Sequence, residues 1–120
     1  MIIKYELVDK VSLLGYRSDV PAILRQSDLS VLSSYGEGFG LAIIESLAVG
    51  TICLGSHVSG IKDILDSEYL FELGDSKTLA EKIMKYCNLD LSEKCKNMVK
   101  EYDVNKMVQL YKKVYNNAIQ

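Results

Sequence analysis

Ser33–Gly50 reads S-S-Y-G-E-G-F-G-L-A-I-I-E-S-L-A-V-G, and this segment decides the fold. The apolar run Leu29–Leu32 comes directly before it and predicts a strand. Three glycines follow and predict a turn, because residues without a Cβ let the backbone turn sharply and approach a ligand closely. Leu41–Val49 predicts a helix, which Gly50 ends as a C-terminal cap. A strand, a glycine-rich turn and a helix N-terminus together make the nucleotide site of doubly wound α/β sheets.

The start of this helix suits a phosphate group. Its first N–H groups have no partners within the helix, and the helix dipole adds partial positive charge there. The glycine-rich turn is weak evidence by itself, because such turns are common and the full dinucleotide fingerprint is absent.

The glutamate inside the helical run, Glu45, has only apolar neighbours on its face of the helix. These neighbours are Leu41, Ala42, Ala48 and Val49. We therefore expect the helix to be mostly buried, and an unpartnered buried carboxylate would cost about 1–3 kcal/mol. Glu45 either accepts hydrogen bonds from ligand hydroxyls in a cleft, or it caps a loop or pairs with a buried arginine. For Glu37, in the turn, the structural alternative is a solvated loop charge.

Four consecutive segments resemble one enzyme family in order and spacing. G-E-G-F-G-L-A-I-I-E-S-L-A-V-G resembles the E-x7-E signature of GT-B retaining glycosyltransferases of the family 4 type, with Glu37 and Glu45 at the two glutamate positions. V-S-L-L-G-Y-R-S-D-V, before it, resembles the V-x-F-L-G segment of that family. S-D-L-S-V-L-S-S resembles the A-D-V-x-V-x-P-S strand. T-I-C-L-G-S-H-V-S-G-I-K-D-I-L, after it, resembles the P-V-V-A-S-x-V-G-G-x-x-E-I-I segment.

The resemblance implies a fold and an activity. Residues 1–120 would form a single α/β domain, with a Rossmann-like parallel sheet, flanking helices and a helical C-terminus. This is the later part of a GT-B C-terminal domain, which binds a nucleotide diphosphate sugar. The implied reaction transfers the sugar to an acceptor hydroxyl with retention, in glycan or cell-surface polysaccharide synthesis. We expect no metal and no cofactor, because the nucleotide sugar is the substrate and no D-x-D pair is present.

The resemblance also assigns residues. The implied donor-binding residues are Gly15, Tyr16, Arg17, Gly38, Phe39, Gly40, Leu41 and Glu45, and the implied catalytic residue is Glu37. Backbone N–H groups at the helix start would hold the diphosphate, Glu45 the ribose hydroxyls and Glu37 the hydroxyls of the donor sugar. Tyr16 and Arg17 would approach the base, or they are ordinary loop residues. Ser59, Gly60 and Asp63 would mainly shape a strand-to-helix turn.

Part of the family pattern falls outside this chain. The resemblance implies an acceptor-binding N-terminal domain, missing here or supplied as a partner chain. It also implies an earlier loop with Arg and Lys for the diphosphate, which Arg17, Arg25 and Lys62 do not match. Two alternatives therefore stay open: a non-catalytic nucleotide-binding remnant, and an interaction scaffold from a truncated or split gene.

The remaining sequence predicts alternating strands and helices, then helices only. The expected strands are Val11–Leu14, Leu29–Leu32, Thr51–Leu54 and Tyr69–Leu73. The expected further helices span Ile61–Leu65, Lys77–Tyr86 and Leu91–Glu101, and two more follow the N-caps Ser18 or Asp19 and Asp103. Ser76 or Asp75 is the expected N-cap of Lys77–Tyr86. We expect the apolar face of the last helix to pack on the sheet. In the family this helix tends to cross back to the N-terminal domain, which is the other contact open to it.

Composition excludes several classes. A net charge of −2 and 48% apolar residues describe a globular protein and give no basic face for nucleic acid. The apolar runs are too short to span a bilayer. Three cysteines without paired spacing argue against a disulfide framework, and the single histidine, His57, against a zinc site. We expect a cytoplasmic protein, either free or peripheral at the inner membrane face. Exposed sheet or helix surface would permit a homo-oligomer.

Overall fold

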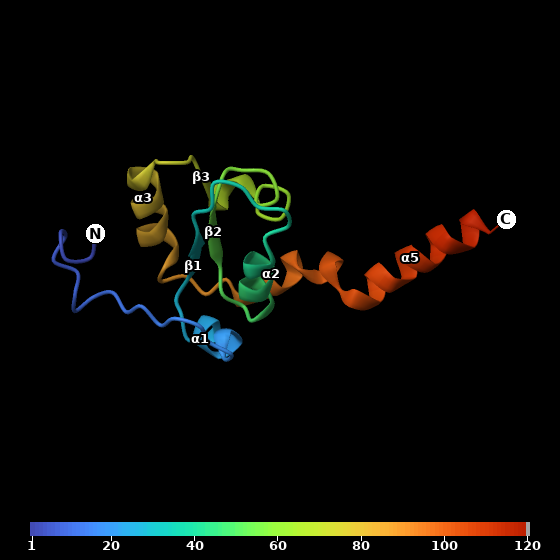
Figure 1. Ribbon diagram of the computed structural model, residues 1–120, viewed down its shortest axis with the longest axis horizontal. Helices are drawn as coiled ribbons and strands as arrows, with labels where there is room; N and C mark the ends of the chain where they lie inside the picture. Colours follow the sequence, from blue (N-terminus) through green and yellow to red (C-terminus); the bar gives the residue numbers. More distant parts are fainter. Residues whose placement is uncertain (120) are drawn as a thin grey trace.

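A three-stranded parallel sheet forms the centre of the computed structural model, which describes residues 1–119 (Figure 1). The strands, in sheet order, are β1 (Ser30–Leu32), β2 (Cys53–Ser56) and β3 (Leu70–Phe71). Val31 lies opposite Leu54, and Gly55 lies opposite Leu70. The predicted Rossmann-like parallel sheet with flanking helices and a helical C-terminus is confirmed.

The central strand is fully buried because helices cover it on both sides. All four residues of β2 are buried, as expected for a short strand inside a parallel sheet. Helix α2 (Leu41–Ala48) packs Ile43 and Leu47 against the strands, and α3 (Ser76–Tyr86) lies on their other side in Figure 1. The core therefore rests on a few large apolar side chains, each of which contributes about 1.5–3 kcal/mol when fully buried.

Short helices complete the chain, several of them near the positions predicted from the sequence. They are α1 (Val20–Arg25), the 3₁₀ turn η1 (Ser67–Tyr69), α4 (Ser92–Met98), the 3₁₀ turn η2 (Lys100–Tyr102) and α5 (Val104–Ala118). The Asp75 carboxylate accepts a hydrogen bond from the Thr78 N–H at the start of α3, and the Asp103 carboxylate accepts one from the Asn105 N–H at the start of α5. The predicted N-caps Asp75 and Asp103 are confirmed, whereas the side chain of Asp19, at the start of α1, makes no cap hydrogen bond.

Two predicted elements do not form. Residues 11–14 are not a strand: the segment pairs with none of the three strands, and Leu13 and Leu14 are exposed. A short apolar run becomes a strand only beside a partner strand, and β1 has none on that edge. The predicted helix over Ile61–Leu65 is a series of turns, in which Ile61 and Leu65 point into the core. The predicted helix over Leu91–Glu101 is divided into α4 and η2.

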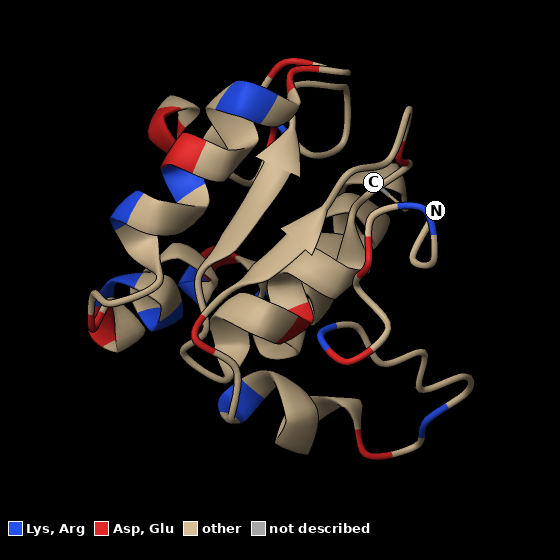
Figure 2. Ribbon diagram, turned by 90° about the vertical axis from the view of Figure 1, so that its left-hand side faces the viewer, with Lys and Arg blue, Asp and Glu red and all other residues tan. Residues whose placement is uncertain are grey.

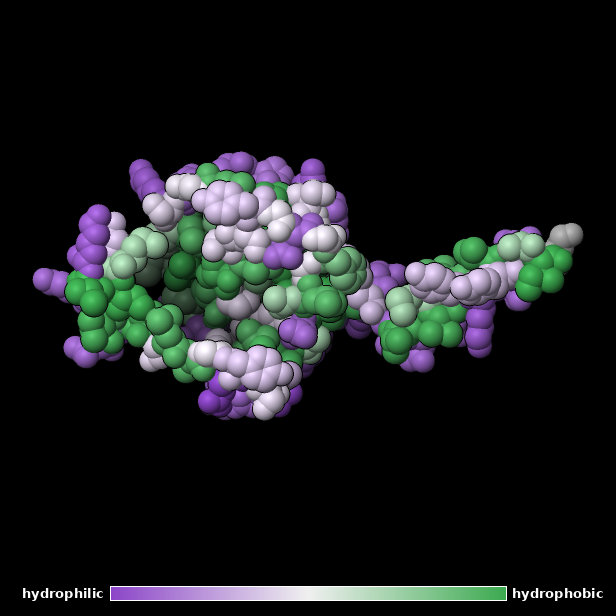
Figure 3. Space-filling view, viewed as in Figure 1, coloured by the Kyte–Doolittle hydropathy of each residue, from purple (hydrophilic) through white to green (hydrophobic). Residues whose placement is uncertain are grey.

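The C-terminal helix does not pack on the sheet, contrary to our expectation. Helix α5 has no buried residue and extends from the body of the protein (Figure 1). The radius of gyration, 17.1 Å, exceeds the value of about 14 Å for a compact chain of this length. Figure 3 shows hydrophobic residues exposed along this extension. Amphipathic spacing therefore predicted the helix correctly but not the surface that its apolar face meets.

Charges of both signs are interspersed on the face in Figure 2, and no face of a single sign is formed there. Within residues 1–119, no helix combines the length and the apolar character needed to span a bilayer.

Candidate functional site

The glycine-rich turn connects the end of β1 to the start of α2, at the carboxyl end of the parallel strands. Gly40 is the N-cap of α2 and has a φ of +67°, a left-handed conformation that favours glycine. A Cβ on Gly40 would also press on the Ile43 side chain, at 3.2 Å. Because no side chain caps this helix, its first N–H groups remain available to a ligand.

Glu45 lies on the exposed face of α2, so the predicted burial of its stripe is wrong. The helix turns Ile43, Ser46 and Leu47 inward, and its other face carries Glu45 beside apolar residues that are also exposed. Leu41, for example, is 65% exposed. The apolar neighbours of Glu45 therefore lie on an apolar surface and not in the core. Pairing with a buried arginine, one of the structural alternatives given for Glu45, does not occur. None of the four ion pairs within residues 1–119 includes Glu45.

Glu37 is half-buried, and serines that our sequence analysis missed hold it in place. The Ser34 hydroxyl donates a hydrogen bond of 2.6 Å to Glu37 Oε1. The hydroxyl of Ser56, the last residue of β2, donates one of 2.5 Å to the Ser34 carbonyl oxygen. Ser56 is fully buried. The position of Ser34, three residues before a turn glutamate, was the available sequence signal for the first contact.

The loop after β2 supports the same turn. Gly60 has a φ of +83°, and a Cβ there would overlap the Glu37 carbonyl oxygen. The Gly60 N–H donates a hydrogen bond of 3.1 Å to the Asp63 carboxylate. Gly60 and Asp63 therefore shape this loop, as predicted, and their loop packs directly against the backbone of Glu37.

The aromatic ring of Phe39 connects the turn to the C-terminal segment. It meets the Tyr102 ring edge to face, with 5.6 Å between the ring centroids. The Tyr102 hydroxyl donates a hydrogen bond of 3.2 Å to the Asp63 carbonyl oxygen. Tyr102, at the base of α5, thus contacts both loops that surround Glu37.

Gly15, Tyr16 and Arg17 lie apart from the turn. Their segment leads into α1, which Figure 1 places at the foot of the strands, whereas the glycine-rich turn lies above their upper ends. Tyr16 is 97% exposed. The Arg17 guanidinium donates two hydrogen bonds, of 2.8 and 2.6 Å, to the Asp19 carboxylate, which lowers the pKa of that carboxyl. The structure therefore brings together the implied residues of the turn and α2 but not these three.

Other polar groups near the carboxyl end of the strands form local pairs. Nδ1 of His57, directly after β2, lies 2.7 Å from Glu72 Oε1, directly after β3. His57 is thus a loop residue paired with Glu72. Within residues 1–119, no three acidic, cysteine or histidine side chains gather into a group that could hold a metal ion.

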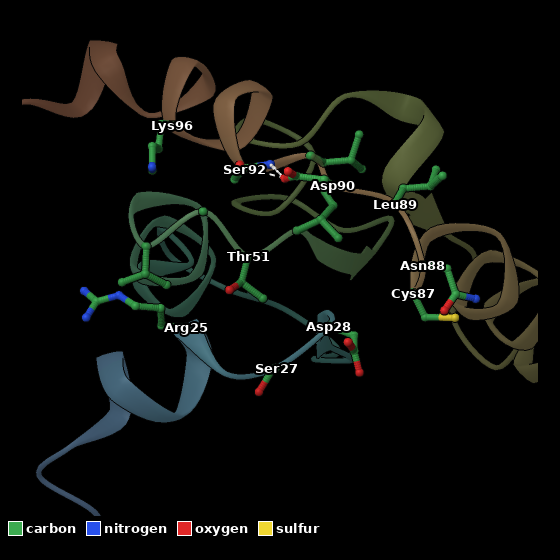
Figure 4. A pocket seen from close by; sticks show the side chains of 14 residues that line it. Arg25, Ser27, Asp28, Thr51, Cys87, Asn88, Leu89, Asp90, Ser92 and Lys96 are labelled. Carbon is green, nitrogen blue, oxygen red and sulfur yellow. Dashed lines mark hydrogen bonds between the residues drawn. The ribbon is translucent and has the colours of Figure 1, made fainter.

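A separate hollow of about 630 Å³ lies at the opposite end of the strands (Figure 4). Its lining includes Arg25, Thr51, Asp90 and Lys96. The Thr51 hydroxyl donates a hydrogen bond to the Leu24 carbonyl oxygen, and the Asp90 carboxylate accepts one from the Ser92 hydroxyl. Thr51 and Asp90 are thus already hydrogen-bonded within the chain. The hollow contains none of the donor-binding or catalytic residues implied by the sequence.

Comparison with known proteins gives a consistent result. Residues 1–103 match the family model of the glycosyl transferases group 1. The chain is 31% identical to N-acetyl-alpha-D-glucosaminyl L-malate synthase of Bacillus anthracis, over 92% of this chain and 32% of that protein. It is 33% identical to UDP-Gal:alpha-D-GlcNAc-diphosphoundecaprenol alpha-1,3-galactosyltransferase of Escherichia coli, over 94% of this chain and 31% of that protein.

A solved structure shares the fold. The crystal structure of Anabaena HepE in complex with UDP and glucose superimposes with a TM-score of 0.85 and 22% identity. The match covers 97% of this chain and 34% of that protein. The chain thus spans about a third of the length of the relatives it matches. The match of residues 1–103 to the family model shows that the chain belongs to the glycosyl transferases group 1.

Proposed function

We propose that this chain is the donor-binding part of a retaining glycosyltransferase. Taken as a single domain, residues 1–120 bind a nucleotide diphosphate sugar, and the complete enzyme transfers the sugar to an acceptor hydroxyl. The proposal places the reaction in cell-surface polysaccharide synthesis, in the cytoplasm or at the inner membrane face. It is supported by family membership and by the names of relatives, one of which is a galactosyltransferase that acts on a diphosphoundecaprenol-linked sugar.

One observation carries the proposal: two glutamates flank an uncapped helix N-terminus at the carboxyl end of a parallel sheet. Glu37 lies three residues before Gly40, the N-cap, and Glu45 lies five residues after it. Ligands of open α/β sheets bind outside the carboxyl ends of the strands. An anion at the start of α2 therefore has hydroxyl-binding carboxylates on both sides, as a nucleotide sugar requires.

Each group then has a chemical task. The N–H groups of Gly38, Phe39, Gly40 and Leu41 hold the diphosphate. Glu45 accepts hydrogen bonds from the ribose hydroxyls, and Glu37 accepts them from the donor sugar and places its anomeric carbon. As the glycosidic bond breaks, the helix dipole stabilises the charge on the leaving diphosphate, so positioning and charge stabilisation supply the catalysis without a metal.

Gly15, Tyr16 and Arg17 join the site only after a rearrangement. For Arg17 to stack on a base, its guanidinium must leave the Asp19 carboxylate. Such a solvent-exposed ion pair contributes little to stability, so stacking on a base can replace it.

The proposed partner is an acceptor-binding part, either linked to this chain or separate from it. The exposed apolar face of α5 is assigned to that contact, because none of residues 1–119 covers it. Sedimentation of the purified chain tests the alternative of a homo-oligomer: a concentration-dependent increase in mass would show that copies of the chain associate.

Affinity measurements test the donor site. UDP, GDP and ADP are titrated into the chain by calorimetry, together with Glu45→Gln and the control Glu93→Gln. Glu93 is an exposed glutamate on α4. We expect one nucleotide to bind. We expect Glu45→Gln to lower the affinity for that nucleotide about tenfold, because hydrogen bonds to a charged acceptor are lost. Equal affinity in the two variants would contradict the assigned role of Glu45. Binding without transfer, once the acceptor-binding part is supplied, would favour a non-catalytic nucleotide-binding protein.

A further inference from the structure

Glu37 is held by Ser34, which a residue of β2 holds in turn. The side chain is half-buried, and its Oε1 accepts the 2.6 Å hydrogen bond from the Ser34 hydroxyl. Ser34 is itself fixed, because its carbonyl oxygen accepts the 2.5 Å hydrogen bond from the buried Ser56 hydroxyl. The contacts therefore run without interruption from the end of β2, through the backbone after β1, to the carboxylate.

The backbone of Glu37 is held as well. Gly60 lies so close to the Glu37 carbonyl group that a Cβ on Gly60 would overlap it. Side chain and main chain are thus restrained from different directions: the carboxylate by Ser34, and the peptide group by the loop after β2. A loop glutamate with three rotatable bonds would otherwise be free to reorient.

We propose that Ser34 is a positioning residue that orients the Glu37 carboxylate toward the donor sugar, and that Ser56 holds Ser34 in place. The inference rests on the proposed donor site. Ser34 occupies Oε1 and leaves Oε2 available to accept a hydrogen bond from a sugar hydroxyl. Because the hydroxyl donates to a carboxylate, the contact is charge-assisted and directional. The orientation exists before the ligand binds, so binding does not have to order this side chain.

The first test needs no ligand. Three-bond couplings across χ1 of Glu37 are measured by NMR in the wild-type chain and in Ser34→Ala, Ser34→Thr and Ser33→Ala. Ser33 is the adjacent exposed serine and serves as the control. We expect couplings of a single rotamer in the wild type, Ser33→Ala and Ser34→Thr, which keeps the hydroxyl. We expect averaged couplings in Ser34→Ala. Averaged couplings in the wild type, or unchanged couplings in Ser34→Ala, would overturn the inference.

The second test separates positioning from general folding. The affinities of UDP, GDP and ADP, and of their glucose derivatives, are measured for the same variants and for Glu37→Gln. We expect Ser34→Ala to lower the affinity for the nucleotide sugar about fivefold and to change the affinity for the free nucleotide by less than about twofold. Adding Ser34→Ala to Glu37→Gln should then cause no further loss. If a free nucleotide binds and Ser34→Ala leaves the affinity for the nucleotide sugar unchanged, the positioning role of Ser34 is overturned while the proposed function stands. If no nucleotide binds, the proposed function fails, and the couplings decide the positioning role by themselves.

Discussion

The Tyr102 ring meets the Phe39 ring edge to face at 5.6 Å, which joins the base of the C-terminal helix to the glycine-rich turn. Phe39 is half exposed and lies one residue before the N-cap of α2. The Tyr102 hydroxyl also reaches the Asp63 carbonyl oxygen in the loop after β2. A residue close to the projecting α5 thus contacts both loops of the candidate site, so we expect changes at Tyr102 to be detected there.

Replacing Tyr102 tests this connection. We expect Tyr102→Ala to lower the free energy of unfolding by about 1–2 kcal/mol, because the ring pair and the hydrogen bond to Asp63 are both lost. Tyr102→Phe keeps the ring and should lose about half of that. Urea unfolding gives the stabilities, and amide hydrogen exchange at Phe39 reports the turn. Equal stability of Tyr102→Ala and the wild type would show that the contact contributes nothing.

Gly60 and Gly74 form a matched pair. Both have positive φ values, +83° and +81°, but only a Cβ on Gly60 would overlap another part of the backbone, at Glu37. Gly74→Ala should therefore cost about 1–2 kcal/mol from its conformation alone. Gly60→Ala should cost at least about 2 kcal/mol more, because the turn must move. Denaturant unfolding measures both losses of stability. Similar losses in the two variants would mean that the turn moves at little cost in free energy.

Glu68 predicts a pH dependence of stability. Its carboxylate accepts a 2.6 Å hydrogen bond from Lys94 Nζ and a 3.1 Å bond from the Tyr86 hydroxyl, and the Lys94 bond is the main reason why the pKa of Glu68 is lowered. A carboxyl whose pKa is lower in the folded state stabilises the fold above the ordinary value of about 4.3, and this contribution is lost as the pH falls through the lowered pKa.

Glu68→Gln should accordingly be less stable than the wild type at pH 7, by at most about 1 kcal/mol because the pair is half exposed. The difference should shrink as the pH falls below about 4. Unfolding in urea at pH 7 and pH 3 measures it, with Glu81→Gln, an exposed position on α3, as the control. A difference that grows on acidification would contradict the assigned contact.

Much of this arrangement follows from local patterns in the sequence. The glycine-rich turn, the start of α2 and the caps at Asp75 and Asp103 depend on residues close together in the chain, and each was predicted. Features set by distant residues were missed. The Ser56 bond to Ser34 spans 22 positions, and the bond from Tyr102 to Asp63 spans 39, so neither leaves a periodic signal.

Three of the errors have a common physical origin. A run of apolar residues predicts that a surface will be covered but not what covers it. Leu41 beside Glu45, and the face of α5, were therefore expected inside this chain although both are exposed. Residues 11–14 were expected as a strand for the same reason and have no partner strand.

The most direct test of the donor site locates the bound nucleotide. Amide resonances of the chain are followed by NMR during titration with UDP, GDP and ADP, for the wild type and Glu45→Ala. We expect saturating shifts at Phe39, Gly40 and Leu41 with one nucleotide, and their loss in the variant. A folded chain without shifts at these amides at millimolar concentrations of all three nucleotides would contradict the proposed donor site.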